Sequence, residues 1–274
     1  MRTKLIACDV MREEIEALCG EMGLAPAAMD AEYLEMELHD RPEELLRPEL
    51  ARRVGALRDA PYDAILLGLG LCSNCVVGLG APGIPLVLPR MHDCVTLFLG
   101  SRARYRAEHD REPGTYWYAR GFLHRRPPKA SQASAGSTLP DGMEHTGLAG
   151  GRGNGAEGGQ AASDRESQYR KWVEDYGEDN AQYLMEEWLD AWVKNYKRAV
   201  YMSWDGNPDQ ATDRENIRQY AAGNKWAFAD MPVDLGLLRG LLDGGWQKRP
   251  DDYLVVLPGQ SIQASHDFDV VRAV

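Results

Sequence analysis

The stretch YDAILLGLGLCSNCVVGLG (residues 62–80) runs from an apolar segment into a glycine-rich turn that carries two cysteines. Its apolar run over 62–70 predicts a buried β-strand, and the glycines that follow end that strand. A turn and a short helix are expected next, before a further strand over 83–90. The stretch therefore predicts a fold built from short buried strands that end in glycine or polar turns.

Predicted strands and helices also alternate on both sides of this stretch. Further strands are expected over 3–10, 27–37 and 114–122, and helices over 11–23, over 41–59 and after Asp93, which is placed to cap the last of them. Strands that alternate with helices in this way indicate βαβ units and a parallel sheet.

The second half of the chain repeats the alternation. A long helix carrying Trp188 and Trp192 precedes three strands, expected over 198–204, 227–233 and 251–259, with helices between them. Because the two halves share this outline, an internal pseudo-repeat is expected. The predicted fold class is α/β, with two Rossmann-like lobes around parallel sheets and a cleft between them.

A change in composition separates the two halves. Residues 127–165 are rich in glycine, serine and alanine and carry almost no large apolar side chains, so they bury too little surface to offset their ordering entropy. We therefore predict three parts: an N-terminal lobe over 1–126, a flexible insertion over 127–165 and a C-terminal lobe over 166–274.

The insertion leads to a first testable prediction. Limited proteolysis is expected to cut first within residues 128–163, and deletion of that segment is expected to leave the rest folded, because loop length changes stability only slowly. Mass spectrometry of the early fragments locates the cuts, and circular dichroism reports the fold of the deletion variant. A deletion variant that does not fold would show that the segment is structural.

The charge balance excludes several classes of partner. The chain has 31 Lys and Arg against 42 Asp and Glu, a net charge of −11 with no basic run. Nucleic acid and anionic membranes are bound through Lys and Arg, so neither is an expected partner. No apolar stretch approaches the ~20 residues of a membrane span. An odd number of cysteines, five, without an export signal at the start of the sequence predicts a cytoplasmic protein with free or metal-bound thiols.

Candidate site residues gather where predicted strands end. In an open parallel sheet, ligands bind beyond the carboxyl ends of the strands. Four cysteines follow three such ends together with a histidine and an aspartate, and a second histidine follows the strand over 27–37, whereas Cys19 falls inside a helix. The strand-end residues are Cys8, His39, Cys72, Cys75, His92, Asp93 and Cys94.

Two thiols three positions apart in a turn can bind one metal ion. Gly68 and Gly70 would let the backbone approach a bound cofactor closely, and Cys94, Cys8 or His92 would supply the remaining ligands. A sulfur-rich set of this kind selects zinc or an iron–sulfur cluster. Such a site could be catalytic, with His92 and Asp93 as proton-handling groups, or structural, and the sequence leaves this open.

Other interpretations of the same residues remain open. Buried cysteines often serve as small apolar side chains, and Asp93 is a helix cap in the first place. Ser73 and Asn74, with backbone N–H groups nearby, could hold an anion. The alternative function is therefore a metal-free module that binds a small anionic ligand in the cleft between the lobes.

Several stretches together resemble the DUF1638 family, and the resemblance runs over nearly the whole chain outside about 127–165. They are LIACDVMREEIEAL, YDAILLGLGLCSNCVVGL, IPLVLPRMHDCVTLFLGSRARY, EPGTYW, YGEDNAQYLMEEW and LGLLRGLLDGGW with DDYLVVLPG. The LCSN and HDC motifs are the most specific part.

The resemblance implies a setting in corrinoid-dependent methyl transfer, as an accessory or methyl-transfer protein, with a corrinoid or methyltransferase protein as partner. The family pattern matches Cys8, Cys72, His92, Asp93 and Cys94. It has glycine more often than cysteine at position 75, which favours Cys8, Cys72 and Cys94 as the core ligand set.

The topology gives one further prediction about this set. If the strand over 3–10 is central and lies beside the strand over 62–70, the sulfurs of Cys8, Cys72 and Cys94 converge on one pocket, because parallel strands are only ~4.8 Å apart. His92 then lies at the rim of this pocket, and Cys19 is remote from it.

Overall fold

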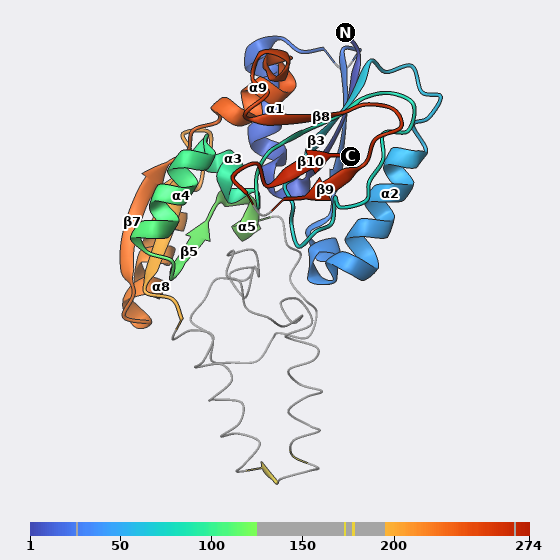
Figure 1. Ribbon diagram of the computed structural model, residues 1–274. Helices are drawn as coiled ribbons and strands as arrows, with labels where there is room; N and C mark the ends of the chain where they lie inside the picture. The colour runs from blue at the N-terminus through green and yellow to red at the C-terminus, as the bar shows by residue number, and fades with distance from the viewer. Residues whose placement is uncertain (26, 125–172, 174–176, 179–194, 266) are drawn as a thin grey trace.

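The computed structural model describes residues 1–25, 27–124, 173, 177–178, 195–265 and 267–274, and the following account concerns these residues. Strands and helices alternate along the chain, and most of the strands belong to two mainly parallel sheets (Figure 1). The α/β class predicted from the sequence is thus confirmed.

The first sheet has five strands in the order β2-β1-β3-β4-β8. The first four of these are parallel, and β8 pairs with β4 in the antiparallel direction. The strands are β1 (Thr3–Cys8), β2 (Met29–Leu34), β3 (Ala64–Gly68), β4 (Leu86–Pro89) and β8 (Tyr253–Val256). Both central strands, β1 and β3, are buried along their whole length, which is why their sequences are apolar without alternation.

Helices cover this sheet on two sides. Figure 1 shows α2 on one side and α1 with α9 on the other. The elements that follow or flank these strands are η1 (Asp9–Met11), α1 (Arg12–Met22), η2 (Met36–Asp40), η3 (Pro42–Leu46), α2 (Arg47–Gly55), α3 (Val95–Leu99), α9 (Gly236–Leu242) and η4 (Gly245–Lys248). The first helix ends at Gly23, whose left-handed backbone (φ 63°) lets its N–H bond to the last carbonyls of the helix.

The second sheet is smaller and entirely parallel, with the order β5-β6-β7. It consists of β5 (Thr115–Tyr118), β6 (Arg198–Ser203) and β7 (Ala227–Pro232), with α4 (Arg102–Arg111), α5 (Arg120–His124) and α8 (Gln210–Gly223) around it. An aromatic core, in which Tyr116, Tyr118 and Trp226 are prominent, fills the space between this sheet and its helices.

Each of these two sheets combines strands that precede residues 127–165 with strands that follow them. The strand β5 precedes that segment and pairs with β6, whereas β8 follows it and pairs with β4. The two sheets differ in strand number and in strand direction, so the internal pseudo-repeat is not confirmed. The predicted insertion over 127–165 lies outside the described residues, as does the helix segment that carries Trp188 and Trp192.

Two local features differ from the sequence prediction. The helix expected after Asp93 is interrupted at Gly100, whose φ is 74°, and α4 restarts after Ser101, whose Oγ accepts a hydrogen bond of 3.1 Å from the Arg104 N–H. An antiparallel hairpin of β9 (Ile262–Ala264) and β10 (Val271–Ala273) was not predicted, because three-residue strands give almost no periodic signal. In the part of the chain that the structure describes, every helix is too short or too polar to cross a membrane.

The carboxyl ends of the two sheets meet at one junction. Directly after β1, Val10 packs against Gly121 of α5, which follows β5, and a β-carbon on this glycine would lie 1.8 Å from the Val10 carbonyl oxygen. Beside this contact, the Arg120 guanidinium forms an ion pair with Glu13 of α1. The residues that follow β1 are therefore held directly against the residues that follow β5.

Candidate functional site

The candidate site lies where the order of strands in the first sheet reverses. From β1 the chain goes to β2 on one side and then returns to β3 on the other side. Loops after two such neighbouring strands diverge, and the crevice between them is the usual ligand site of an open α/β sheet. Cys8 is the last residue of β1, and Cys72 lies in the loop that follows β3.

Four of the five cysteines are buried at this edge. The exposed fractions are 1% for Cys8, 6% for Cys72, 1% for Cys75 and 3% for Cys94, and all of them are free thiols. Cys8 interacts electrostatically with Cys72, and Cys94 interacts with both. Thiols from three strand ends therefore lie close to one another, whereas Cys19 is half-buried in α1.

The surroundings of Cys8, Cys75 and Cys94 favour their protonated form. Burial raises the pKa of Cys8 to about 12 and, as the largest cause, raises the pKa of Cys94 well above its ordinary value. A hydrogen bond with the Cys72 sulfur is the main cause that raises the pKa of Cys75, followed by burial. Cys8, Cys75 and Cys94 also resist ionisation because a second thiolate nearby would repel their own negative charge.

The loop that carries Cys72 and Cys75 has an unusual backbone. Three consecutive residues are left-handed, with φ of 39° at Cys72, 55° at Ser73 and 65° at Asn74. This conformation costs non-glycine residues roughly 1–2 kcal/mol each. The short helix predicted here is wrong, since residues 72–78 form turns and left-handed residues cannot start a right-handed helix.

Contacts between the loops after β3 and β4 hold this backbone in place. The N–H of Leu71 donates to the Met91 carbonyl at 2.9 Å, and the N–H of Cys72 donates to the His92 carbonyl at 2.8 Å. Gly70 makes room for the approach, since a β-carbon there would lie 2.9 Å from the Met91 oxygen.

The other predicted glycine also serves packing within the chain. At Gly68 a β-carbon would lie 2.6 Å from that of Ala7 on the neighbouring strand β1. The close approaches of Gly68 and Gly70 are thus made to strand and loop neighbours. Their predicted contact with a cofactor stays a prediction.

The two candidate histidines occupy different environments. Nε2 of His39, in η2, lies 3.3 Å from Sγ of Cys8. His92 is an exposed residue, and its backbone carbonyl accepts the hydrogen bond from Cys72. His39 therefore touches a buried thiol, and its place after the second strand is the sequence signal that points to it.

Asp93 is a buried helix-start residue beside the thiols. Its carboxylate accepts hydrogen bonds of 3.1 Å from the Val95 N–H and from the Tyr105 hydroxyl, so the predicted capping role is confirmed. Burial raises the pKa of Asp93 to about 6, against the lowering effect of these hydrogen bonds.

A cation that no sequence pattern predicted lies at this edge. Arg47, at the start of α2, donates to the Asn74 carbonyl at 2.9 Å, and its charge lowers the pKa of Cys75. Its Nε is buried and lacks a hydrogen-bond partner among the described residues. Ser73 and Asn74 are themselves exposed, so a guanidinium lies beside the loop that was predicted to hold an anion.

The cysteine cluster is not arranged as a finished metal site. Within the described ranges, no group of three or more His, Cys, Asp or Glu side chains has the arrangement needed to hold a metal ion. Binding of a metal would therefore require the sulfurs to move closer together.

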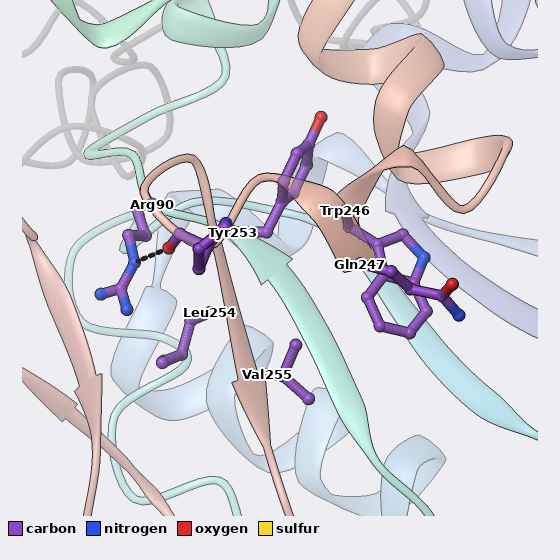
Figure 2. A pocket seen from close by; sticks show the side chains of 7 residues that line it. Arg90, Trp246, Gln247, Tyr253, Leu254 and Val255 are labelled. Atoms are coloured by element: carbon purple, nitrogen blue, oxygen red, sulfur yellow. Dashed lines mark hydrogen bonds between the residues drawn. The ribbon is translucent and has the colours of Figure 1, made fainter.

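A hollow of about 420 Å³ lies elsewhere on the first sheet (Figure 2). It is lined by residues of η4 and β8, of the segment between them, and by the residue after β4: Arg90, Trp246, Gln247, Pro250, Tyr253, Leu254 and Val255. Nε of Arg90 donates to the Pro250 carbonyl at 3.1 Å across one side of it. These residues all belong to the first sheet and its surroundings, so this hollow is not the cleft between lobes that the alternative function invokes.

A second polar cluster, also missed, follows β5 and β6 of the smaller sheet. Nε2 of His124 lies 2.9 Å from Oδ1 of Asp213, and the Asn207 amide donates to Oδ2 of the same carboxylate at 2.8 Å. The Asn207 oxygen in turn accepts from Arg120 at 2.5 Å. These bonds tie α5 to α8 beside the junction, and the sequence carries no spacing motif that would reveal them.

The burial of the thiols leads to a second prediction. Iodoacetamide at mildly alkaline pH is expected to modify Cys19 first, and Cys8, Cys75 and Cys94 only slowly, because thiolates are the reacting species and these groups are buried with raised pKa values. Peptide mass spectrometry over a time course measures the order. Fast labelling of Cys8 or Cys94 in the folded chain would contradict it.

Comparison with known proteins gives one match. The family model described as "Protein of unknown function (DUF1638)" matches residues 33–242. Neither the search of curated proteins nor that of solved structures gives a match. Because the family match covers most of the chain and includes the loops after β3 and β4, this protein belongs to the DUF1638 family.

Proposed function

We propose that the protein binds a soft metal, zinc or an iron–sulfur cluster, through thiolates of Cys8, Cys72 and Cys94. One observation carries the proposal: buried thiols from three strand ends gather where the strand order reverses. Sulfur ligands in this number select soft metals over magnesium or calcium. His39, at 3.3 Å from Cys8, and His92, at the exposed rim, are the nitrogen ligands within the same edge.

The electrostatics of the cluster fit a cation. Burial and mutual repulsion disfavour the thiolate forms of Cys8 and Cys94. A divalent metal reverses both effects, because it binds thiolates and displaces their protons. Binding is therefore expected to release protons and to tighten as the pH rises.

The setting of this site is proposed from the family resemblance. We place it in corrinoid-dependent or other one-carbon methyl transfer, either as an accessory protein or as the protein that carries the methyl group. A metal-bound thiolate with an open coordination position is a suitable nucleophile for such chemistry. The expected partner is a corrinoid or methyltransferase protein.

Metal content tests the proposal most directly. Wild-type protein purified without oxygen is expected to hold about one equivalent of metal, and Cys72→Ser is expected to lose most of it. Cys19→Ser is the matched control and should retain the metal, since Cys19 lies in α1. A further pair, His39→Gln and His92→Gln, identifies the nitrogen ligand. Folded wild-type protein that stays metal-free in the presence of zinc and of iron with sulfide would refute the proposal.

The second candidate is a metal-free module that binds a small anion. It is favoured by Arg47, whose buried Nε lacks a described partner beside the exposed Ser73 and Asn74. Calorimetry with inorganic phosphate should then show binding that Arg47→Gln abolishes, while Cys72→Ser leaves it intact. The metal proposal predicts instead that Cys72→Ser loses the bound ligand, which in that case is the metal.

A further inference from the structure

Cys72 and Cys75 face each other across a single tight turn. The N–H of Cys75 donates to the Cys72 carbonyl at 3.2 Å, which closes a four-residue turn over 72–75. Positive φ at both central residues, Ser73 and Asn74, is the signature of a type I′ turn. The α-carbons at the two ends of a β-turn lie less than about 7 Å apart, within the range over which a disulfide can form.

The side chains are close as well as the backbone. A hydrogen bond links the two sulfurs and dominates the electrostatic environment of Cys75. Cys8 and Cys94 interact with Cys72 through charge and lie at or beyond the ends of separate strands, β1 and β4. A bond between Cys72 and Cys75 therefore needs the least backbone movement of any pairing in the cluster.

Two further features favour thiol chemistry at this pair. Cys72 is the most exposed residue among the four buried cysteines, at 6%, so it is the member of the cluster that an external reagent reaches first. The left-handed backbone at Cys72, Ser73 and Asn74 is also the kind of local strain that persists where the surrounding structure imposes it.

We propose that Cys72 and Cys75 form a dithiol that exchanges with low-molecular-weight disulfides and closes to an intramolecular disulfide. The Cys72 thiolate attacks one sulfur of the external disulfide, which yields a mixed disulfide and expels one thiolate. Cys75 then attacks Sγ of Cys72 and expels the second thiolate. The protons of both cysteines end on the two released thiols, and two electrons pass from the protein to the external disulfide.

This activity goes beyond metal binding and does not depend on it. If the metal site proposed above is real, closure of the disulfide withdraws Cys72 from the ligand set, so oxidation and metal binding exclude each other. Oxidised glutathione is the probe for the exchange itself, and a chelator present throughout separates the test from the metal proposal.

Reduced, metal-free protein is incubated with oxidised glutathione, alkylated and mapped by mass spectrometry. The expected product is one peptide that contains both Cys72 and Cys75, lighter by two hydrogens and unalkylated at both, with two reduced glutathiones released per chain. Cys75→Ser should stop at a glutathione adduct on Cys72. Cys94→Ser, the matched control in the same cluster, should still form the internal disulfide.

Three results would overturn the proposal. In the first, both thiols of the wild-type protein stay reduced while Cys19 is modified. In the second, the disulfide joins Cys72 to Cys8 or Cys94. In the third, an internal disulfide persists in Cys75→Ser. The wild-type peptide map alone decides the first two, so the test stands even where a variant does not fold.

Discussion

Gly121→Ala is expected to lower the free energy of unfolding by about 3 kcal/mol, the upper end of the usual cost of overpacking. The new β-carbon would lie 1.8 Å from the Val10 carbonyl oxygen and 2.8 Å from its α-carbon. Because these are backbone atoms, no side-chain rotation relieves the overlap, and α5 must move away from η1. Denaturant unfolding followed by circular dichroism measures the loss.

Gly20→Ala is the matched control for this variant. Gly20 also lies in a helix, α1, and a β-carbon there would meet no atom within 4 Å. The control should therefore gain roughly 0.5–1 kcal/mol from the better helix propensity of alanine. Equal stabilities for the two variants would show that the contact between α5 and η1 does not hold the carboxyl ends of the two sheets together.

The free energy of unfolding of the metal-free protein is expected to fall as the pH rises from about 4 to about 6, through Asp93. Its folded-state pKa of about 6 lies above the ordinary value of 3.8, so between these values the folded protein keeps a proton that the unfolded chain releases. This contribution is fully present below pH ~4 and is lost as the pH passes ~6. Its size is on the order of 3 kcal/mol.

Asp93→Asn isolates this contribution. The amide oxygen still accepts a hydrogen bond from Val95 but carries no charge to bury, so the stability of the variant relative to wild type should rise by that amount between pH 4 and pH 7. Asp267→Asn is the control, since hydrogen bonds lower the pKa of exposed Asp267 and its contribution has the opposite sign. A pH-independent difference between Asp93→Asn and wild type would show that Asp93 ionises as easily in the folded chain as in the unfolded one.

Sequence patterns predicted the centre of the first sheet well because β1 and β3 are buried along their whole length. The apolar runs around Leu5 and Leu66 mark β1 and β3 directly, and their pairing follows the expected order, with β4 beside β3. What the patterns could not show was which sheet each later strand joins. Tyr116 in β5 and Leu254 in β8 belong to equally apolar strands, and periodicity reports burial without naming the partner.

The candidate site, too, could be predicted from the sequence only in part. Cysteines at the ends of strands could be placed at one edge, because the topology of a parallel sheet fixes where those ends lie. The contact of His39 with Cys8 and the position of Arg47 beside Asn74 depend on how separate loops fold onto each other. The left-handed turn over 72–74 has the same origin, since residues other than glycine adopt it only when neighbouring chain segments impose it.

The late arrival of β8 bears on how the polypeptide reaches its native state during synthesis. Pro89 at the end of β4 pairs with Tyr253 at the start of β8. The outer edge of β4 therefore stays without its partner strand β8 until the ribosome has synthesised the residues between them. Pairings this distant raise contact order and slow folding, and an open strand edge recruits other chains. Nascent or truncated chains that lack residues 253–256 are therefore expected to depend on chaperones and to aggregate through β4.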